Sequence, residues 1–166
     1  MTSIAEKSDT ELSSAIQKGD AVDFKTLFYR YHDPLFFFLR KRLRSDDTAR
    51  DLVQEVFTRL WQNRANLNPS KPIKAYLFRA AHNLVVDAYR KKSNQEIALE
   101  DDMLNQFSED PHHTNEVESG VEAAIGALDE PIRAVFLMNR FDGLKYREIA
   151  ETLEISVKTV EARMSK

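Results

Sequence analysis

The chain of 166 residues contains no cysteine, only four glycines and five prolines, and no long apolar run. The lack of cysteine excludes disulfide bonds, thiolate metal sites and cysteine nucleophiles. The longest strongly apolar stretch, residues 35–39, is far shorter than the roughly 20 residues that span a bilayer. Residues 1–12 hold no apolar core of a secretion signal. We therefore expect a cytoplasmic protein without membrane insertion.

Charge is distributed unevenly along the chain. The net charge is −3, but residues 94–118 hold eight acidic residues and no lysine or arginine. The remaining residues include 24 basic and 19 acidic side chains. Basic segments on both sides of an acidic one are compatible with nucleic-acid binding, which the net charge alone would disfavour.

Helical spacing of apolar residues predominates, and neither a strand pattern nor an internal repeat is visible. We expect an all-α chain with two small helical domains, residues 1–93 and 117–166. Residues 94–116, rich in polar and acidic side chains, are expected to form an acidic flexible linker. A short helical turn is expected within it at 97–107.

Capping residues and prolines set the expected helix ends in the first domain. Asp9 is expected to cap a short first helix, and Asp20 a second helix. Pro34 is expected to break or restart that second helix. Ser45 or Asp46 is expected to cap the next one.

Residues 51–62 have the pattern of an amphipathic helix with one wide apolar face. The apolar positions are Leu52, Val53, Val56, Phe57, Leu60 and Trp61. The opposite face carries Asp51, Gln54, Glu55 and Thr58. Most polar helix faces are simply solvated. The alternative is an interface in which the amide and the carboxylates bind a basic helical partner.

A basic helix is expected after this, with Pro72 at its first position and its end near Lys92. Residues 71–92 hold six lysines or arginines and one acidic residue. The expected buried stripe consists of Ile73, Tyr76, Leu77, Ala80, Ala81, Leu84, Val85 and Ala88. The side chains expected away from it are Lys74, Phe78, His82, Asn83, Asp87 and Arg90. Cations, aromatic rings and amides together suit single-strand binding, although a basic helix C-terminus is also favoured by the helix dipole.

The last third of the chain has the spacing of a helix-turn-helix. One helix is expected to begin at 129–131 and to stop at 142–143, followed by short helices at 145–153 and from Val157 onward. Ser156 is a natural N-cap for the last helix. Exposed residues near its start suit readout of base edges in the major groove. Glu154 occupies a turn position where many such motifs have glycine, which would cost about 1 kcal/mol if φ is positive.

These three segments resemble, in order, the regions of a sigma factor. Asp51–Phe57 followed by Leu60–Trp61, together with residues 74–92, resembles region 2 of extracytoplasmic-function (ECF) sigma factors. Residues 146–164 resemble their region 4, and also the helix-turn-helix of LuxR-type regulators. The resemblance implies an alternative sigma factor that binds core RNA polymerase, recognises minus-thirty-five and minus-ten promoter elements, and promotes DNA melting.

The resemblance also implies a role for individual residues. The residues implied to bind the clamp coiled coil of the largest polymerase subunit are Asp51, Gln54, Glu55 and Thr58. The residues implied to lie at the minus-ten element are Lys74, Arg79, Asn83, Asp87, Arg90, Lys91 and Lys92. Phe78, as a stacking ring, and His82, as a phosphate contact, are also expected there. The residues expected at the minus-thirty-five element are Ser156, Lys158, Thr159, Glu161 and Arg163. Promoter DNA, core polymerase and an anti-sigma factor are the expected partners.

Two other classes of protein are alternatives to a sigma factor. A stand-alone helix-turn-helix regulator would explain the last domain but not the two segments before it. An enzyme is disfavoured, because no phosphate loop, nucleophile motif or metal-ligand spacing is present, so we expect no cofactor. His112 and His113 have no third spaced ligand, so we expect no metal site. The sequence ends at Lys166, inside the expected recognition helix, and the resemblance implies a region 4 that is incomplete there.

Overall fold

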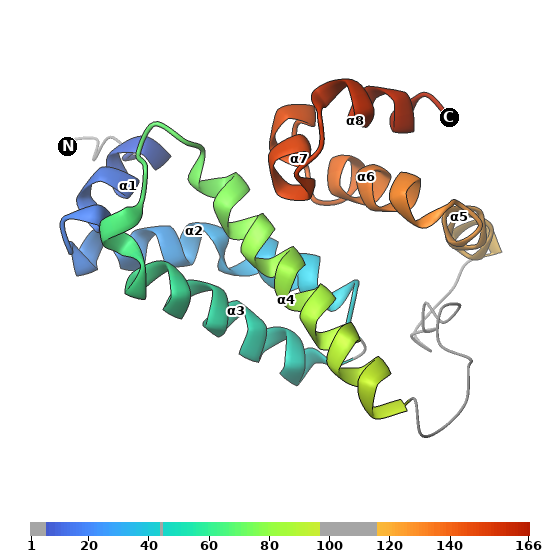
Figure 1. Ribbon diagram of the computed structural model, residues 1–166, viewed down its shortest axis with the longest axis horizontal. Helices are drawn as coiled ribbons and strands as arrows, with labels where there is room; N and C mark the ends of the chain where they lie inside the picture. Colours follow the sequence, from blue (N-terminus) through green and yellow to red (C-terminus); the bar gives the residue numbers. More distant parts are fainter. Residues whose placement is uncertain (1–5, 44, 97–115) are drawn as a thin grey trace. The chain divides into compact units, whose positions relative to one another are not determined.

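The computed structural model describes residues 6–43, 45–96 and 116–166 of the chain (Figure 1). These residues form helices and connecting turns, with no strand among them, which confirms the expected all-α class. The elements are α1 (Asp9–Gln17), α2 (Ala21–Arg40), α3 (Asp46–Gln62), the short 3-10 helix η1 (Arg64–Asn66), α4 (Ile73–Glu96), α5 (Glu116–Gly126), α6 (Glu130–Arg140), α7 (Tyr146–Leu153) and α8 (Val157–Met164).

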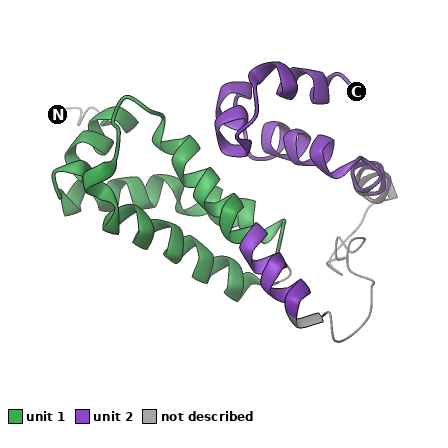
Figure 2. Cartoon of the chain, in the orientation of Figure 1, with its two compact units in different colours: residues 1–85 green, residues 86–166 purple. Residues whose placement is uncertain are grey.

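The chain divides into two compact units, residues 1–85 and 86–166, and Figure 2 shows the division inside α4. The expected domain boundary at residue 93 stays a prediction. The helix α4 continues to Glu96, so residues 94–96 are helical, although they were assigned to the linker. The expected turn at 97–107 and the two histidines at 112–113 lie outside the described residues.

The N-cap of the first helix lies one residue before the expected one. Ser8, not Asp9, is the N-cap, because the Glu11 N–H donates to its hydroxyl while the Ser8 N–H donates to the Glu11 carboxylate at 2.7 Å. This reciprocal pair satisfies two backbone donors that have no helical partner. Asp20 and Ser45 cap α2 and α3 as expected.

The expectation that Pro34 interrupts the second helix is wrong. α2 runs without a break from Ala21 to Arg40 with Pro34 inside it. Pro34 is exposed, while Tyr31, Leu35 and Phe38 near it are buried in the core. The ring removes the donor to the Arg30 carbonyl. We attribute the unbroken helix to the buried contacts on both sides of the proline.

The first unit is built on side chains that three long helices bury together. Leu27, Leu35 and Leu39 of α2 are fully buried, and α2 packs against both α1 and α3. Phe38 of α2 meets Phe78 of α4 in a T-shaped contact with ring centroids 5.1 Å apart. Fully burying one such side chain stabilises the fold by about 1.5–3 kcal/mol. This packing fixes which faces of α3 and α4 remain exposed.

Ion pairs fasten the start of the chain to α2. The Lys7 ammonium group donates to both carboxylate oxygens of Asp23, at 2.8 and 2.7 Å, and Asp23 is buried. Arg30 donates to the Asp9 carboxylate at 2.7 Å and to the Lys7 carbonyl at 2.7 Å. Tyr31 also donates to Asp9. The two bonds from Lys7 pair the buried Asp23 charge, which would otherwise be costly.

Within the second unit, α6, α7 and α8 pack on one another as a helix-turn-helix. Val135 and Met138 of α6, Ile149 of α7 and Val160 of α8 have no exposed surface. The Asn139 side chain donates to the Leu144 carbonyl at 3.0 Å and holds the turn between α6 and α7. The three helices begin within a residue of their expected starts, and α6 and α7 end within two residues of their expected ends.

Candidate functional site

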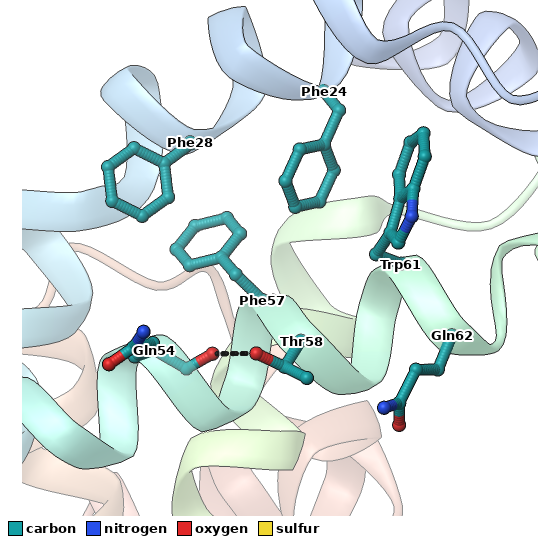
Figure 3. A pocket seen from close by; sticks show the side chains of 7 residues that line it. All are labelled: Phe24, Phe28, Gln54, Phe57, Thr58, Trp61 and Gln62. Carbon is teal, nitrogen blue, oxygen red and sulfur yellow. Dashed lines mark hydrogen bonds between the residues drawn. The ribbon is translucent and has the colours of Figure 1, made fainter.

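The polar face of α3 is exposed as expected. Asp51, Gln54 and Thr58 are exposed, whereas Val53, Val56 and Leu60 on the other side of the helix are buried. The Thr58 hydroxyl donates to the Gln54 carbonyl at 2.8 Å, one turn back along the same helix (Figure 3). The side chains of both residues stand on the surface, where a partner could contact them.

Glu55 differs from the other three residues of this face. It is half-buried, and the Arg59 guanidinium lies 2.7 Å from its carboxylate, one helical turn away. Both side chains retain nearly half of their exposure, so this pair is a surface ion pair worth about 0.3–0.5 kcal/mol. A cationic partner would therefore have to share the Glu55 carboxylate with Arg59.

An open hollow of about 330 Å³ lies between α2 and α3, beside this polar face. Figure 3 shows four aromatic rings gathered there, from Phe24 and Phe28 of α2 and from Phe57 and Trp61 of α3. The Phe28 and Phe57 centroids are 4.8 Å apart, and those of Phe24 and Trp61 are 5.0 Å apart. The polar side chains that complete its lining are Gln54, Thr58 and Gln62.

The aromatic hollow was not predicted from the sequence. Phe57 and Trp61 were expected in the buried stripe of α3. Trp61 is only half-buried and faces the hollow, with the Arg64 guanidinium 4.3 Å from its ring centroid. Such a hollow could accept apolar side chains of a partner that also contacts Gln54 and Thr58.

The helix α4 presents a polar and basic face. The residues of the expected minus-ten set that are exposed are Arg79, Asn83, Asp87, Arg90, Lys91 and Lys92. Lys74 and His82 are half-buried. Tyr76, expected in the buried stripe, is half-buried, and this burial raises the pKa of its hydroxyl while the nearby Arg59 charge lowers it. The exposed cations suit contacts with phosphates.

Phe78 lies on the wrong side of α4 for the role that was expected of it. Its side chain has no exposed surface and packs against Phe38, with the two rings nearly perpendicular at 87°. A ring that is fully enclosed cannot stack on a nucleobase without opening the core. The placement of Phe78 on the exposed face is therefore wrong, and we remove it from the candidate DNA-binding residues.

At the start of α8, one of the residues expected to contact the minus-thirty-five element also caps the helix. The Thr159 N–H donates to the Ser156 hydroxyl at 3.0 Å, and the two hydroxyl groups are 2.8 Å apart. Ser156 is thus the N-cap that the sequence predicted. Lys158 and Glu161 are exposed, and Thr159 and Arg163 are half-buried. The first turn of α8 therefore offers one cation and several polar groups to a groove of DNA.

Neither a cluster of candidate metal ligands nor a candidate membrane-spanning helix occurs in the part of the chain that the structure describes. No group of three His, Asp or Glu side chains there could hold a metal ion. None of the described helices combines the length and the apolar character that a membrane crossing needs.

Comparison with known proteins identifies both units. The family model described as Sigma-70 region 2 matches residues 27–95, and the one described as Sigma-70, region 4 matches residues 120–166. The RNA polymerase sigma factor SigZ of Bacillus subtilis is 26% identical over 145 residues, covering 87% of this chain and 82% of SigZ. The ECF RNA polymerase sigma factor SigW of the same organism is 28% identical over 163 residues, covering 90% of this chain and 87% of SigW.

A solved structure supports the same family. The structure of CnrH in complex with the cytosolic domain of CnrY matches with a TM-score of 0.70 and 26% identity. The match covers 95% of this chain and 90% of CnrH, which is an RNA polymerase sigma factor of Cupriavidus metallidurans.

The fold and both family models define an RNA polymerase sigma factor with a region 2 and a region 4 domain. The chain belongs to the sigma-70 family, in its extracytoplasmic-function group. It directs RNA polymerase to promoters for transcription initiation, and sigma factors are non-enzymatic subunits that bind core polymerase and DNA. The region 2 match decides against a stand-alone helix-turn-helix regulator.

Proposed function

We propose that α3 carries the surface that docks on core polymerase, and that this surface includes the aromatic hollow. Gln54 and Thr58 are exposed on α3 and also line the hollow, so polar and apolar contacts are available side by side. Strong interfaces usually combine a few buried aromatic anchors with a polar rim. The partner implied by the resemblance is the clamp coiled coil of the largest polymerase subunit.

Charged side chains would determine the orientation in which a partner binds this docking surface. Asp51 is an exposed carboxylate, and Glu55 has a second carboxylate that Arg59 already contacts. A basic partner helix would pair with Asp51 and share Glu55 with Arg59. Such pairs set orientation and partner choice more than affinity. Apolar contacts in the hollow would supply most of the binding energy.

We further propose that the exposed face of α4 holds the melted minus-ten strand. Asn83 and Asp87 are exposed one helical turn apart, and exposed cations lie on both sides of them along the helix. Amide and carboxylate groups can bond to base edges, while cations neutralise phosphates. The side chains that carry this role are Lys74, Arg79, His82, Asn83, Asp87, Arg90, Lys91 and Lys92.

The start of α8 is proposed to read the minus-thirty-five element. Its N-terminal residues are the ones that a recognition helix places against base edges. Lys158 and Arg163 supply cations, and Ser156, Thr159 and Glu161 supply polar groups. Ser156 has a second role as the helix cap, so its substitution would affect both the helix and the contact.

An anti-sigma factor is proposed as a further partner, and the cytoplasm as the place of action. CnrH was solved in complex with the cytosolic domain of CnrY. A partner of this kind would compete with core polymerase if it covered the hollow beside Gln54.

The single observation that carries the proposal is that two exposed polar faces lie on different helices of region 2. Gln54 and Thr58 are exposed on α3, and Asn83 is exposed on α4. Contacts made by one face need not depend on the other. Docking and strand capture should therefore be separable by substitution.

The experiment compares two variants in core binding and in promoter opening. Gln54→Ala combined with Glu55→Ala should weaken core binding at least tenfold, because it removes an amide and a carboxylate from the proposed interface. Asn83→Ala should leave core binding unchanged and slow promoter opening. The matched control is Glu6→Ala with Thr10→Ala, which also removes one carboxylate and one neutral polar group at exposed positions.

Binding is measured by titrating labelled protein with core polymerase. Opening is measured by permanganate reactivity on a promoter that the wild-type holoenzyme selects from genomic fragments. If the double variant binds core polymerase as tightly as wild type, the proposed docking role of α3 is wrong. Wild-type opening with Asn83→Ala would remove Asn83 from the minus-ten site.

A further inference from the structure

Among the described side chains of α4, one aromatic ring is well exposed. Tyr89 has 55% of its surface exposed, whereas Phe78 is fully buried and Tyr76 is half-buried. Single-strand binding uses aromatic rings on which bases stack, and the exclusion of Phe78 leaves that role without a side chain. Tyr89 is the aromatic residue of this helix that can meet a base.

The neighbours of Tyr89 on the helix are those of a strand-binding surface. Tyr89 follows His82 by seven residues, so the two lie on the same side of α4, about 10 Å apart along its axis. Arg79 and Arg90 border this side, and Lys91 and Lys92 continue the helix. All residues from Tyr89 to Asn94 are exposed, so this end of α4 is accessible from solvent.

We infer that Tyr89 stacks on an unpaired base of the melted promoter strand and holds that strand on α4. The inference rests on the proposed role of α4 in promoter opening and adds to it a residue outside the expected set. Every base has a π-face, so stacking would hold the strand without reading its sequence. At about 1.5 Å per residue, the Tyr89 position lies about 9 Å along the helix from Asn83, a distance of two to three nucleotides.

Exposure of a tyrosine alone does not carry the inference. Tyr29 on α2 is 68% exposed, with the Lys25 ammonium 5.8 Å from its ring centroid. The cations of α2 are spread along the helix at Lys25, Arg30 and Arg40 and form no continuous run beside Tyr29. Tyr89 differs because it stands within the segment 71–92, where cations outnumber acidic residues six to one. Tyr29 therefore provides a matched control for the loss of an exposed tyrosine.

The test compares Tyr89→Ala, Tyr89→Phe and Tyr29→Ala in holoenzymes with equal core occupancy. We expect Tyr89→Ala to slow permanganate-detected opening by about 5- to 160-fold, the loss that removal of one base-stacking ring produces. Tyr89→Phe retains a ring and should stay within twofold of wild type. Tyr29→Ala should do the same. All three should bind core polymerase as tightly as wild type.

A direct readout uses a promoter fork with 5-iodouracil at successive positions of the single-stranded segment. Irradiation should cross-link one position to Tyr89, identified by mass spectrometry, and Tyr89→Ala should abolish that cross-link. Opening by Tyr89→Ala within twofold of wild type, together with no cross-link at Tyr89, overturns the inference. If Asn83→Ala still slows opening, the proposed role of α4 survives that result. If neither variant slows opening, that role fails as well.

Discussion

At the scale of single residues, Glu154 shows a conflict between the turn and the side chain that occupies it. Its backbone is left-handed, with φ 55° and ψ 41°. Among the described residues, the other positive φ values belong to Gly19 and Gly143. A side chain in this conformation costs about 1 kcal/mol. The turn between α7 and α8 therefore holds a residue that its backbone does not favour.

Glu154→Gly should raise the free energy of unfolding of the helix-turn-helix by about 0.5–1 kcal/mol, because glycine adopts positive φ without the steric cost. The measurement is hydrogen exchange of the α7 and α8 amides, which should slow. The control is Glu151→Gly, at an exposed position inside α7, which should lower the stability by about 1 kcal/mol. Faster exchange in Glu154→Gly would contradict the assigned strain.

The error over Phe78 also belongs to this scale. Phe78, Ala81 and Val85 are spaced as on one helix face, and all three are buried. The spacing alone would have placed Phe78 in the stripe. The expected stripe included Ala81 and Val85 but left out Phe78, which lies one turn before Ala81 on the same face. Asn83 and Asp87, whose positions the spacing also determined, are exposed as expected.

At the scale of the element, the helix ends are determined by capping residues that can be identified in the sequence. Ser8 and Glu11 stand at the spacing of a capping box, and this spacing identifies Ser8 as the cap more securely than the charge of Asp9 does. The hydrogen bonds from the Ser8 backbone N–H, and then from its hydroxyl, lower the pKa of Glu11 below its usual value of 4.5. The stability that the capping box gives to α1 therefore depends on pH.

A group with a lowered folded pKa contributes stability that is present above its unfolded pKa and lost as the pH falls through the folded value. For Glu11 this window lies below pH 4.5. We expect the Ser8 amide proton, followed by NMR, to titrate with an apparent pKa below 4.5. Glu11→Gln keeps a capping acceptor without the charge, so that step should vanish. A step at or above 4.5 in the wild type would contradict the capping bond.

The predictions for two other helices were incomplete or wrong. The helix α5 was missed, because its glycines at 120 and 126 and its acidic surroundings resemble a linker, although Val117, Val121 and Ile125 recur every four residues. The second helix was expected to break at Pro34, because the cost of an internal proline is local. The packing that outweighs it comes from other helices.

At the scale of the whole molecule, the order of the motifs predicted the two-domain plan. The docking segment, the basic helix and the helix-turn-helix correspond to α3, α4 and α7–α8. The aromatic hollow was out of reach, because it exists only where Phe24 and Phe28 of α2 meet Phe57 and Trp61 of α3. The spacing of apolar residues within one helix does not predict which side chains of another helix they will contact. The exposed polar face of α3 could thus be predicted, and the aromatic hollow beside it could not.

The measurement that tests the docking surface most directly is photo-cross-linking from α3 within the assembled holoenzyme. A benzophenone side chain is placed at Thr58 or at Gln62, which both line the hollow, and at Thr10 as an exposed control on α1. The proposed interface predicts that Thr58 or Gln62 cross-links to the largest polymerase subunit and that Thr10 does not. Holoenzymes that form normally but give no cross-link to that subunit from either position would contradict it.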